Sequence, residues 1–326
     1  MTDWRYWIAE HKGTLLAIAV FLVMFGVYAG NHPAGLTANV ATTAANKGVL
    51  LALVAMAQTF VVLTAGIDLS VGMVFVLANC LASHLVLGTP IHTALGIAAV
   101  LATGLACGAI NGLIVVYGRL QPIVTTLATG AIYYGIALLL RPVPGGDVNA
   151  ELADALTGQL PGGIPSVLVL LAGIVLVLWV PYRRSLLGRA AYAIGSAEPA
   201  AYMSGVPIGR ARLLAYSLSG VLASLGGLLL TFLTYSGEAS AQIGGTYTLN
   251  SIAAVVLGGV SLFGGSGSAV GAIFGALVLR TIGDLLFVFD LDPLWQPLFQ
   301  GVILLVAVSL ASLRLLRIRN RLELFG

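Results

Sequence analysis

Long charge-free stretches of apolar residues recur along the whole chain, and short segments between them hold most of the charged residues. A helix needs ~20 mostly apolar residues to cross a bilayer, and most of these stretches approach that length. The pattern therefore predicts an all-α, polytopic membrane protein with about ten transmembrane helices. The expected spans lie near residues 14–30, 48–66, 69–88, 93–117, 122–140, 166–182, 212–234, 249–263, 268–288 and 296–313.

Composition leaves little room for a domain in water. Of the 326 residues, 59% are hydrophobic and 8% are charged, against ~25% charged in an ordinary soluble domain. We therefore expect one transmembrane domain over residues 1–326. The net charge of +3 comes from scattered arginines rather than a basic patch, so no nucleic-acid partner is expected. Cys80 and Cys107 lie within apolar runs, which favours buried thiols over a disulfide.

The basic residues predict the orientation of these helices. An even number of spans puts both termini on one side of the membrane. That side then collects most of the basic residues, and a bias of this kind marks the cytoplasmic side. The residues on it are Arg5, Lys12, Arg119, Arg183, Arg184, Arg189, Arg210, Arg212, Arg314, Arg317, Arg319 and Arg321. Lys47 and Arg141 fall on the outer side.

Two connections are longer than a turn. Residues 141–165 face outward, with proline and glycine at both ends and a polar stretch of helical spacing from Asp147 to Gln159. Residues 183–209 face the cytoplasm. Neither is long enough to form a separate domain.

A weak internal repeat joins two distant segments. Residues 62–69 (VLTAGIDL) and residues 255–262 (VVLGGVSL) share an apolar run, a turn that contains glycine and a polar residue at the same place. Internal repeats are common in transporters, where the binding path lies at the interface of the repeats. The two segments are thus a pointer to a transport path.

Asp68 is the one charged residue between Lys47 and Arg119. A carboxylate inside a membrane domain is costly, so it must face protein, water or a backbone that it can cap. Asp68 lies where two spans of ~20 residues would meet. We expect it to cap a helix beginning at Leu69, with a bend at Gly66. Gly66, Asp68, Ser70 and Gly72 are therefore the predicted helix-break and capping residues.

A set of polar residues within the expected spans could line a path for a solute. Each of them could equally form a hydrogen bond between helices, a contact worth ~0.6 kcal/mol on average. The set is a better indication of transport than any single member. The candidates are Gln58, Asp68, Asn79, Asn111, Tyr133, Tyr134 and Asn250.

Several kinds of chemistry find no support in the sequence. Neither lysine follows a glycine, as the lysine of a nucleotide-binding loop must. The histidines and cysteines show no metal-ligand spacing, so no metal site and no catalytic group is expected. Arg280 and Asp284 are four residues apart, which favours a local ion pair on one helix face over an ion-coupling site. Gly104, Gly108 and Gly112 have the spacing of a helix-packing face.

The cytoplasmic connection predicts a short helix near residues 195–205. Ser196 would cap its N-terminus, Pro199 suits its first turn, and Gly205 would end it. Ala200, Ala201, Tyr202 and Met203 would then be exposed apolar residues on a charged surface, as expected of a docking helix.

At this point the chain resembles a known family, the permease subunits of ATP-binding-cassette importers for ribose, xylose and arabinose, related to the branched-chain amino-acid permeases. The resemblance covers nearly all of residues 40–310. It rests on Gly66–Gly72 (GIDLSVG), Asn111-Gly112 with Thr126-Leu127, Leu187–Arg189 with Ala193–Gly195 and Glu198, Ser217–Ser224, and Ile252–Leu262 with Gly264, Gly265 and Gly267.

The resemblance implies a dimeric permease with ten helices in the bacterial inner membrane. It implies two cytoplasmic ATPase subunits, which would hold the ATP and magnesium, and a periplasmic sugar-binding protein. It further implies that residues 195–205 are the coupling helix on the ATPase. The coupling residues carried over are Gly195, Glu198, Pro199, Ala200, Ala201 and Gly205. For Glu198 alone, helix support and partner contact are equally open.

Two alternatives belong to other classes of protein. An ion-coupled secondary carrier using Asp68 would lose uptake when the proton gradient collapses, and it would need no ATPase. A membrane scaffold that transports nothing is less consistent with the repeat and the cytoplasmic connection. Pentose, furanose, autoinducer-like sugar and polyol all stay open as cargo, as does a homodimer or heterodimer. Acidic residues of the outer connections suggest a landing surface for the binding protein, or ordinary solvated loops.

Overall fold

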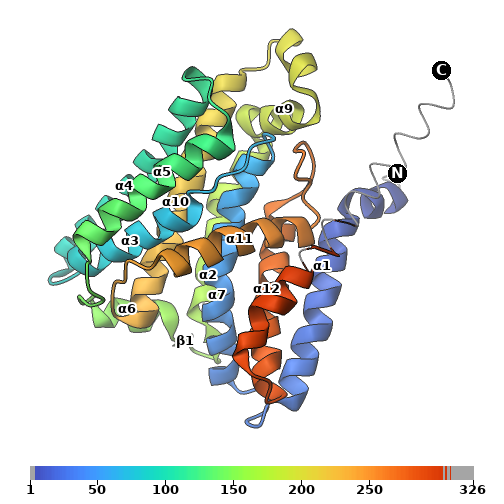
Figure 1. The fold of residues 1–326 in the computed structure, drawn as a ribbon. Helices are drawn as coiled ribbons and strands as arrows, with labels where there is room; N and C mark the ends of the chain where they lie inside the picture. The colour runs from blue at the N-terminus through green and yellow to red at the C-terminus, as the bar shows by residue number, and fades with distance from the viewer. Residues whose placement is uncertain (1–3, 304, 307–308, 310–326) are drawn as a thin grey trace.

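The computed structural model describes residues 4–303, 305–306 and 309, and its regular structure is almost entirely helical. Figure 1 shows helices running between two ends of the molecule, with a kinked helix standing out at one end. The helices are α1 (Trp4–Asn31), α2 (Ala38–Val62), α3 (Val71–Leu85), α4 (Pro90–Tyr117), α5 (Pro122–Leu140), α6 (Ala150–Thr157), α7 (Ser166–Ile174), η1 (Val175–Trp179), α8 (Val180–Arg184), α9 (Leu186–Met203), α10 (Ile208–Thr234), α11 (Ala241–Leu257), α12 (Ala269–Val288) and η2 (Pro293–Trp295). The two short strands are β1 (Gln159–Leu160) and β2 (Ile164–Pro165), paired antiparallel.

Helix α2 lies at the centre of the molecule. It is apolar around its whole circumference and is buried from Val49 to Val62, as expected of a helix enclosed by other helices. It packs against α3, α7, α10, α11 and α12. In Figure 1, α3, α4 and α5 lie on one side of it, and α1 and α12 lie on the other.

Small residues let these helices approach closely. A Cβ atom added to Gly104 of α4 would lie 2.4 Å from the carbonyl oxygen of Gly220 in α10. One added to Gly108 would lie 2.1 Å from the carbonyl oxygen of Tyr216. Contact at this distance needs glycine, so the predicted packing face of Gly104 and Gly108 is confirmed.

Seven of the described helices are long and apolar enough to cross a membrane: His11–Asn31, Ala38–Val62, Pro90–Tyr117, Pro122–Leu140, Ser166–Arg184, Ile208–Thr234 and Ala269–Val288. The all-α, polytopic prediction is therefore confirmed. Two of the predicted spans have different bounds in the structure. Residues 69–88 form only the 15-residue α3, and the helix expected near 249–263 is α11, which ends at Leu257. The last expected span, near 296–313, lies partly outside the described residues.

The two segments of the predicted repeat both follow the end of a helix. After α2, Ala65 takes a positive φ of 60°, and Gly66 N–H donates to Val61 O at 3.3 Å. After α11, Gly259 takes a φ of 78°, and Val260 N–H donates to Val255 O at 3.0 Å. Both are helix ends with a left-handed residue. The segment after α2 also accepts a hydrogen bond from just beyond the second segment, from Gly265 N–H to Leu63 O at 3.2 Å.

The outer connection, residues 141–165, packs on the ends of α3 and α10. Arg141 donates to the hydroxyl oxygen of Ser83 at 2.9 Å and to its carbonyl oxygen at 2.8 Å. The phenol of Tyr235, just after α10, donates to the carboxylate of Asp154 in α6, and this bond raises the pKa of Tyr235. The connection is therefore anchored by polar contacts, with α6 inside the stretch predicted to have helical spacing.

Candidate functional site

Asp68 lies in the irregular segment between α2 and α3, and its side chain is only 2% exposed. One carboxylate oxygen, Oδ1, accepts hydrogen bonds from the Ser70 N–H at 2.9 Å and from the Ser70 hydroxyl at 2.6 Å. The other, Oδ2, accepts from the Ser219 hydroxyl of α10 at 3.2 Å. These three donors compensate the carboxylate for the loss of water.

The same network extends to α4 and α5. The amide of Asn111 donates to the Ser70 hydroxyl oxygen at 2.8 Å. The phenol of Tyr133 donates to Asn111 Oδ1 at 3.3 Å and to the carbonyl oxygen of Cys107 at 3.0 Å. Ser70, Asn111 and Tyr133 are all buried. Three path candidates, Asp68, Asn111 and Tyr133, thus belong to one buried network. A fourth candidate, Gln58, lies beside this network.

Side chains from several helices also bond the backbone of residues 67–72. With its amide oriented to satisfy both groups, Gln58 donates to Asp68 O at 3.0 Å and accepts from Asp68 N–H at 3.2 Å. Thr126 of α5 accepts from Leu69 N–H at 2.9 Å, and Thr248 of α11 accepts from Gly72 N–H at 3.1 Å. Buried backbone groups outside a helix need such partners. The segment is therefore fixed by α2, α5 and α11 together.

Two details of the capping prediction are wrong. Helix α3 begins at Val71, not Leu69, and Asp68 caps only the Ser70 N–H because Thr126 takes the Leu69 N–H. The left-handed residue of the bend is Ala65 rather than Gly66. Gly66 is instead needed for space, because a Cβ there would lie 2.9 Å from the Tyr216 hydroxyl. Gly72 likewise lies against α11, where a Cβ would be 1.9 Å from the carbonyl oxygen of Gly244.

The remaining path candidates lie elsewhere. Asn79 is buried farther along α3, donates to Thr231 of α10 at 2.9 Å, and accepts from the Glu238 N–H at 2.8 Å. Its contacts tie α3 to the end of α10. Tyr134 and Asn250 are partly exposed, and neither takes part in the network around Asp68.

Helix α9 contains the predicted cytoplasmic helix but is longer than expected. Its backbone is non-helical at Ala197, with φ −161° and ψ 92°, so it is in effect two helices joined at a kink. The second one has Pro199 in its first turn and ends at Met203, and Gly205 follows with a φ of 72°. The predicted end at Gly205 is confirmed. The predicted cap is wrong, because the Ser196 hydroxyl donates backward to Tyr192 O at 2.8 Å.

The second half of α9 has one buried and one exposed face. Ala201 is buried against Ile194 and Ala211, so it anchors the helix rather than facing outward. Tyr202 and Met203 are 72% and 84% exposed. Glu198, Pro199, Ala200 and Gly205 are exposed as well. Apolar side chains left this exposed suggest a surface that another protein covers.

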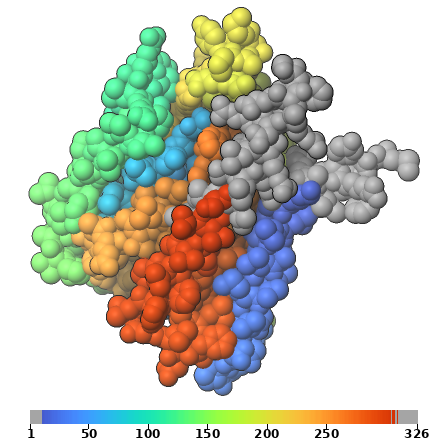
Figure 2. All heavy atoms as spheres, turned by 45° about the vertical axis from the view of Figure 1, so that its right-hand side comes forward, coloured from blue at the N-terminus to red at the C-terminus, as the bar shows by residue number. Residues whose placement is uncertain are grey.

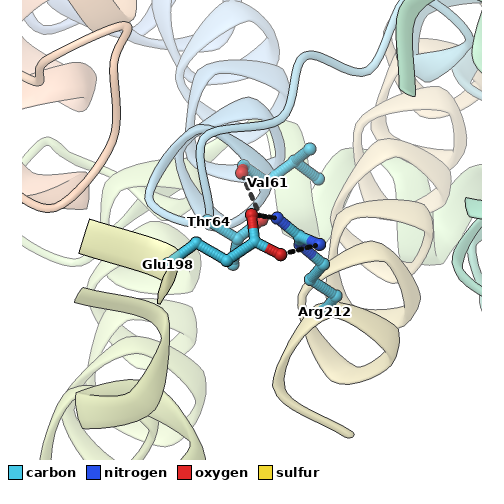
Figure 3. Close-up of polar contacts among 4 residues, drawn as sticks. All are labelled: Val61, Thr64, Glu198 and Arg212. Atoms are coloured by element: carbon cyan, nitrogen blue, oxygen red, sulfur yellow. Dashed lines mark hydrogen bonds and ion pairs between the residues drawn. The ribbon is translucent and has the colours of Figure 1, made fainter. Parts of the chain in front are cut away.

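Glu198 forms an ion pair with Arg212 at the start of α10. The two groups are joined by two hydrogen bonds of 2.9 and 2.6 Å, one to each carboxylate oxygen. Figure 3 shows them facing each other beside Thr64 and Val61 at the end of α2. Such two-pronged pairing fixes orientation as well as attraction. From the sequence, helix support and partner contact were equally open for Glu198, and the pair with Arg212 could not be predicted because the two residues are fourteen positions apart.

Gly195 brings α9 against the first repeat segment and against the turn that follows the second one. A Cβ at Gly195 would lie 2.2 Å from Leu63 O and 2.2 Å from Gly265 N. These two atoms form the hydrogen bond between the first repeat segment and the turn that follows the second one. The exposed helix thus rests, through backbone contact, on the segment that leads to Asp68.

Within the part of the chain that the structure describes, no group of three or more His, Cys, Asp or Glu side chains could hold a metal ion. Cys80 and Cys107 are buried free thiols. The site described above consists of a buried polar network that fixes a helix break and an exposed helix that contacts it.

These features define a polytopic α-helical membrane protein with a buried polar network between α2 and α3 and exposed apolar side chains on α9 at one end. A profile of the branched-chain amino acid transport system / permease component family matches residues 40–308. The chain belongs to this family.

Curated relatives agree with this family. The ribose import permease RbsC of Escherichia coli K12 is 34% identical over 308 residues, which cover 93% of this chain and 94% of the relative. RbsC of Bacillus subtilis is 36% identical over 262 residues, which cover 79% and 80%. The fructose import permease FrcC of Rhizobium meliloti is 32% identical over 304 residues, which cover 91% and 83%. No solved structure gives a significant match.

Proposed function

We propose that this chain is the permease subunit of an ATP-binding-cassette importer that carries a monosaccharide, of pentose or furanose type, across the bacterial inner membrane. Its relatives are named for the import of ribose and fructose, and one for the transport of D-allose. The family match over residues 40–308 supports a permease role for most of the chain.

The coupling of transport to ATP is assigned to α9. ATP and magnesium bind the separate ATPase subunits, and α9 docks on them through the exposed residues Tyr202 and Met203. The observation that carries this assignment is the contact of Gly195 with Leu63 O and Gly265 N. Force applied to α9 then acts on the segment that leads to Asp68 and on the turn that follows the second repeat segment. This geometry suits alternating access, in which one repeat moves against the other.

The wider assembly follows from the same assignment. Ten helices are expected in each permease, with both termini and α9 in the cytoplasm and residues 141–165 facing a periplasmic sugar-binding protein. A second permease copy or paralogue completes the dimer, and membrane lipid surrounds it. ATP hydrolysis belongs to the partner, so this chain is not itself the enzyme.

Charge reversal at Glu198 tests the coupling assignment. E198R places two cations together at the base of the docking helix, so co-purification with the ATPase and ATP-driven uptake should both fall. E151R, in α6 at the opposite end of the molecule, makes the same charge change and should leave ATPase binding intact. Normal ATPase binding and normal uptake in E198R would contradict the assignment.

A further inference from the structure

The end of the molecule opposite α9 contains a cavity between α1, α2 and α12 that is lined by both charged and apolar side chains. Its volume is about 410 Å³, within the range of small-molecule sites. Three helix faces form it, each with residues spaced three or four apart: Tyr28 and His32 on α1, Thr43 and Lys47 on α2, and Arg280 and Asp284 on α12. Figure 1 shows the ends of these three helices together, and Figure 2 shows α1 and α12 side by side on the surface.

The charged groups of this cavity do not pair with one another. The one ion pair within 4 Å among the described residues is that of Arg212 and Glu198. Arg280 and Asp284 therefore do not form the local pair that their spacing predicted. The Nε atom of Arg280 is buried and has no hydrogen-bond acceptor. A buried guanidinium N–H without an acceptor can donate a hydrogen bond to a ligand that enters the cavity.

The charged groups lie well inside the helices. Lys47 is nine residues from the start of α2, or about 13 Å, and Arg280 is eight residues from the end of α12, or about 12 Å. Both residues lie in helices that are long and apolar enough to cross a membrane, and ionisable side chains within such helices are rare and mark solute or ion pathways. Lys47 and Arg280 against Asp284 leave one excess positive charge.

We propose that this cavity binds the carboxylate of a sugar acid, so that the cargo is a monosaccharide that carries one negative charge. This inference rests on the proposed function and narrows its substrate. A carboxylate neutralises the single excess charge and matches the planar guanidinium of Arg280. A phosphate of ~2 negative charges would leave the cavity with an excess of negative charge, because Asp284 is already there.

The rest of the lining suits the hydroxyl groups of a sugar. Asn39, Thr43 and Gln296 offer amide and hydroxyl groups, and the rings of Tyr28 and Phe287 offer apolar surface. The amide of Gln296 lies directly on Gly283, where a Cβ would be 2.9 Å from its oxygen. Gly283 thus leaves room for the amide at the edge of the cavity.

The test is equilibrium binding of radiolabelled D-gluconate to the full chain, assembled with its ATPase, in nanodiscs of phosphatidylcholine. Gluconate should bind saturably, and uncharged D-ribose or inorganic phosphate should not displace it. R280Q should weaken binding about tenfold or more, because a charge-assisted bond is lost. D284N should tighten binding, because it removes a repelling charge. R184Q, which removes an exposed cation at the end of α8, should change nothing.

Absence of gluconate binding, or equal weakening by R184Q and R280Q, would overturn the proposal. So would loss of gluconate binding when anionic phosphatidylglycerol is added, because the cavity would then hold a lipid headgroup. If R280Q does not fold, K47Q serves in its place, since Lys47 is exposed in the cavity. ATP-driven import of neutral sugars without gluconate binding would leave the proposed function intact and remove only this inference.

Discussion

At the scale of single residues, Asp68 shows how a carboxylate is kept in the middle of a membrane protein. Its oxygens accept from Ser70 and Ser219 at 2.6 to 3.2 Å. No basic side chain within ion-pair distance of it is found among the described residues. A carboxylate whose hydrogen bonds are all made to groups inside the protein stabilises the local fold. This arrangement favours a permanent structural role for Asp68 over proton coupling.

The first prediction separates these roles by substitution at Asp68. D68N keeps one acceptor oxygen for Ser70 and should cost less than about 1 kcal/mol of stability, since Asn caps a backbone N–H as well as Asp does. D68A leaves buried donors without an acceptor and should cost about 2 kcal/mol or more. Thermal unfolding in nanodiscs and ATP-driven uptake measure both. Complete loss of uptake in D68N, with normal assembly, would show that the charge itself is used.

Sequence reasoning located Asp68 and the polar residues of its network but could not give their partners. Gln58, Asn111 and Tyr133 were candidates on the basis of polarity alone. Their meeting depends on how α2, α4 and α5 cross, and no local pattern encodes a crossing. Ser219 and Thr248 were missed for a related reason. Serine and threonine are common in membrane helices, where they often bond their own backbone, so Thr248 carried no signal, and Ser219 was given no role although it lies in the stretch Ser217–Ser224.

At the scale of secondary-structure elements, α9 combines an anchored half with an exposed half. The kink at Ala197 turns the second half, and the pair of Glu198 with Arg212 sets its direction relative to α10. Both side chains are partly exposed, at 47% and 22%, so the pair adds at most about 1 kcal/mol to stability. Its effect should therefore appear in docking rather than in folding.

A charge swap tests whether the pair or Glu198 itself matters for docking. R212E alone and E198R alone should each reduce ATPase binding and uptake. The double variant E198R/R212E restores an ion pair of opposite polarity, and uptake should return to within about twofold of the parent because pairs in contact couple. Failure of the double variant to recover, with α9 still folded, would show that the ATPase contacts Glu198 directly.

The junction at Gly195 gives a further prediction. G195A pushes a Cβ against Leu63 O and Gly265 N, and close-packed backbone cannot absorb such overlap without moving. ATP-driven uptake should fall about tenfold or more while ATPase binding persists. G173A in α7 is the matched control, because nothing lies within 4 Å of a Cβ there. Normal uptake in G195A would contradict transmission through this junction.

The sequence predicted the outer bounds of most helices but not their breaks. Charge-free length separates α4, α5 and α10 clearly from their connections. It fails for α3, which ends at Leu85 inside the apolar stretch, and for α11, since the turn at Gly259 continues an apolar run without a polar boundary. The cavity of Lys47, Arg280 and Asp284 was also missed. The spacing of Arg280 and Asp284 predicted only a pair. Lys47 is far from both in the sequence, so no sequence pattern indicated that the three residues line one cavity.

At the scale of the whole molecule, the central α2 links the end that carries α9 to the opposite end. Its far end supports the segment that touches Gly195 and leads to Asp68, and its start lines the charged cavity with Lys47. Helices α10, α11 and α12 pack along it. A movement imposed on α9 can therefore reach the cavity at the opposite end through one helix and its neighbours. This layout is what an importer driven from the cytoplasm requires.

The central claim is that ATP hydrolysed on a partner drives transport through this chain. The direct measurement is uptake of radiolabelled pentoses, hexoses and sugar acids into proteoliposomes that contain the permease, its ATPase and the binding protein. We predict uptake of at least one of these solutes that requires ATP and persists when an ionophore collapses the proton gradient. Uptake by the permease alone, driven by a proton gradient and abolished by the ionophore, would contradict the account.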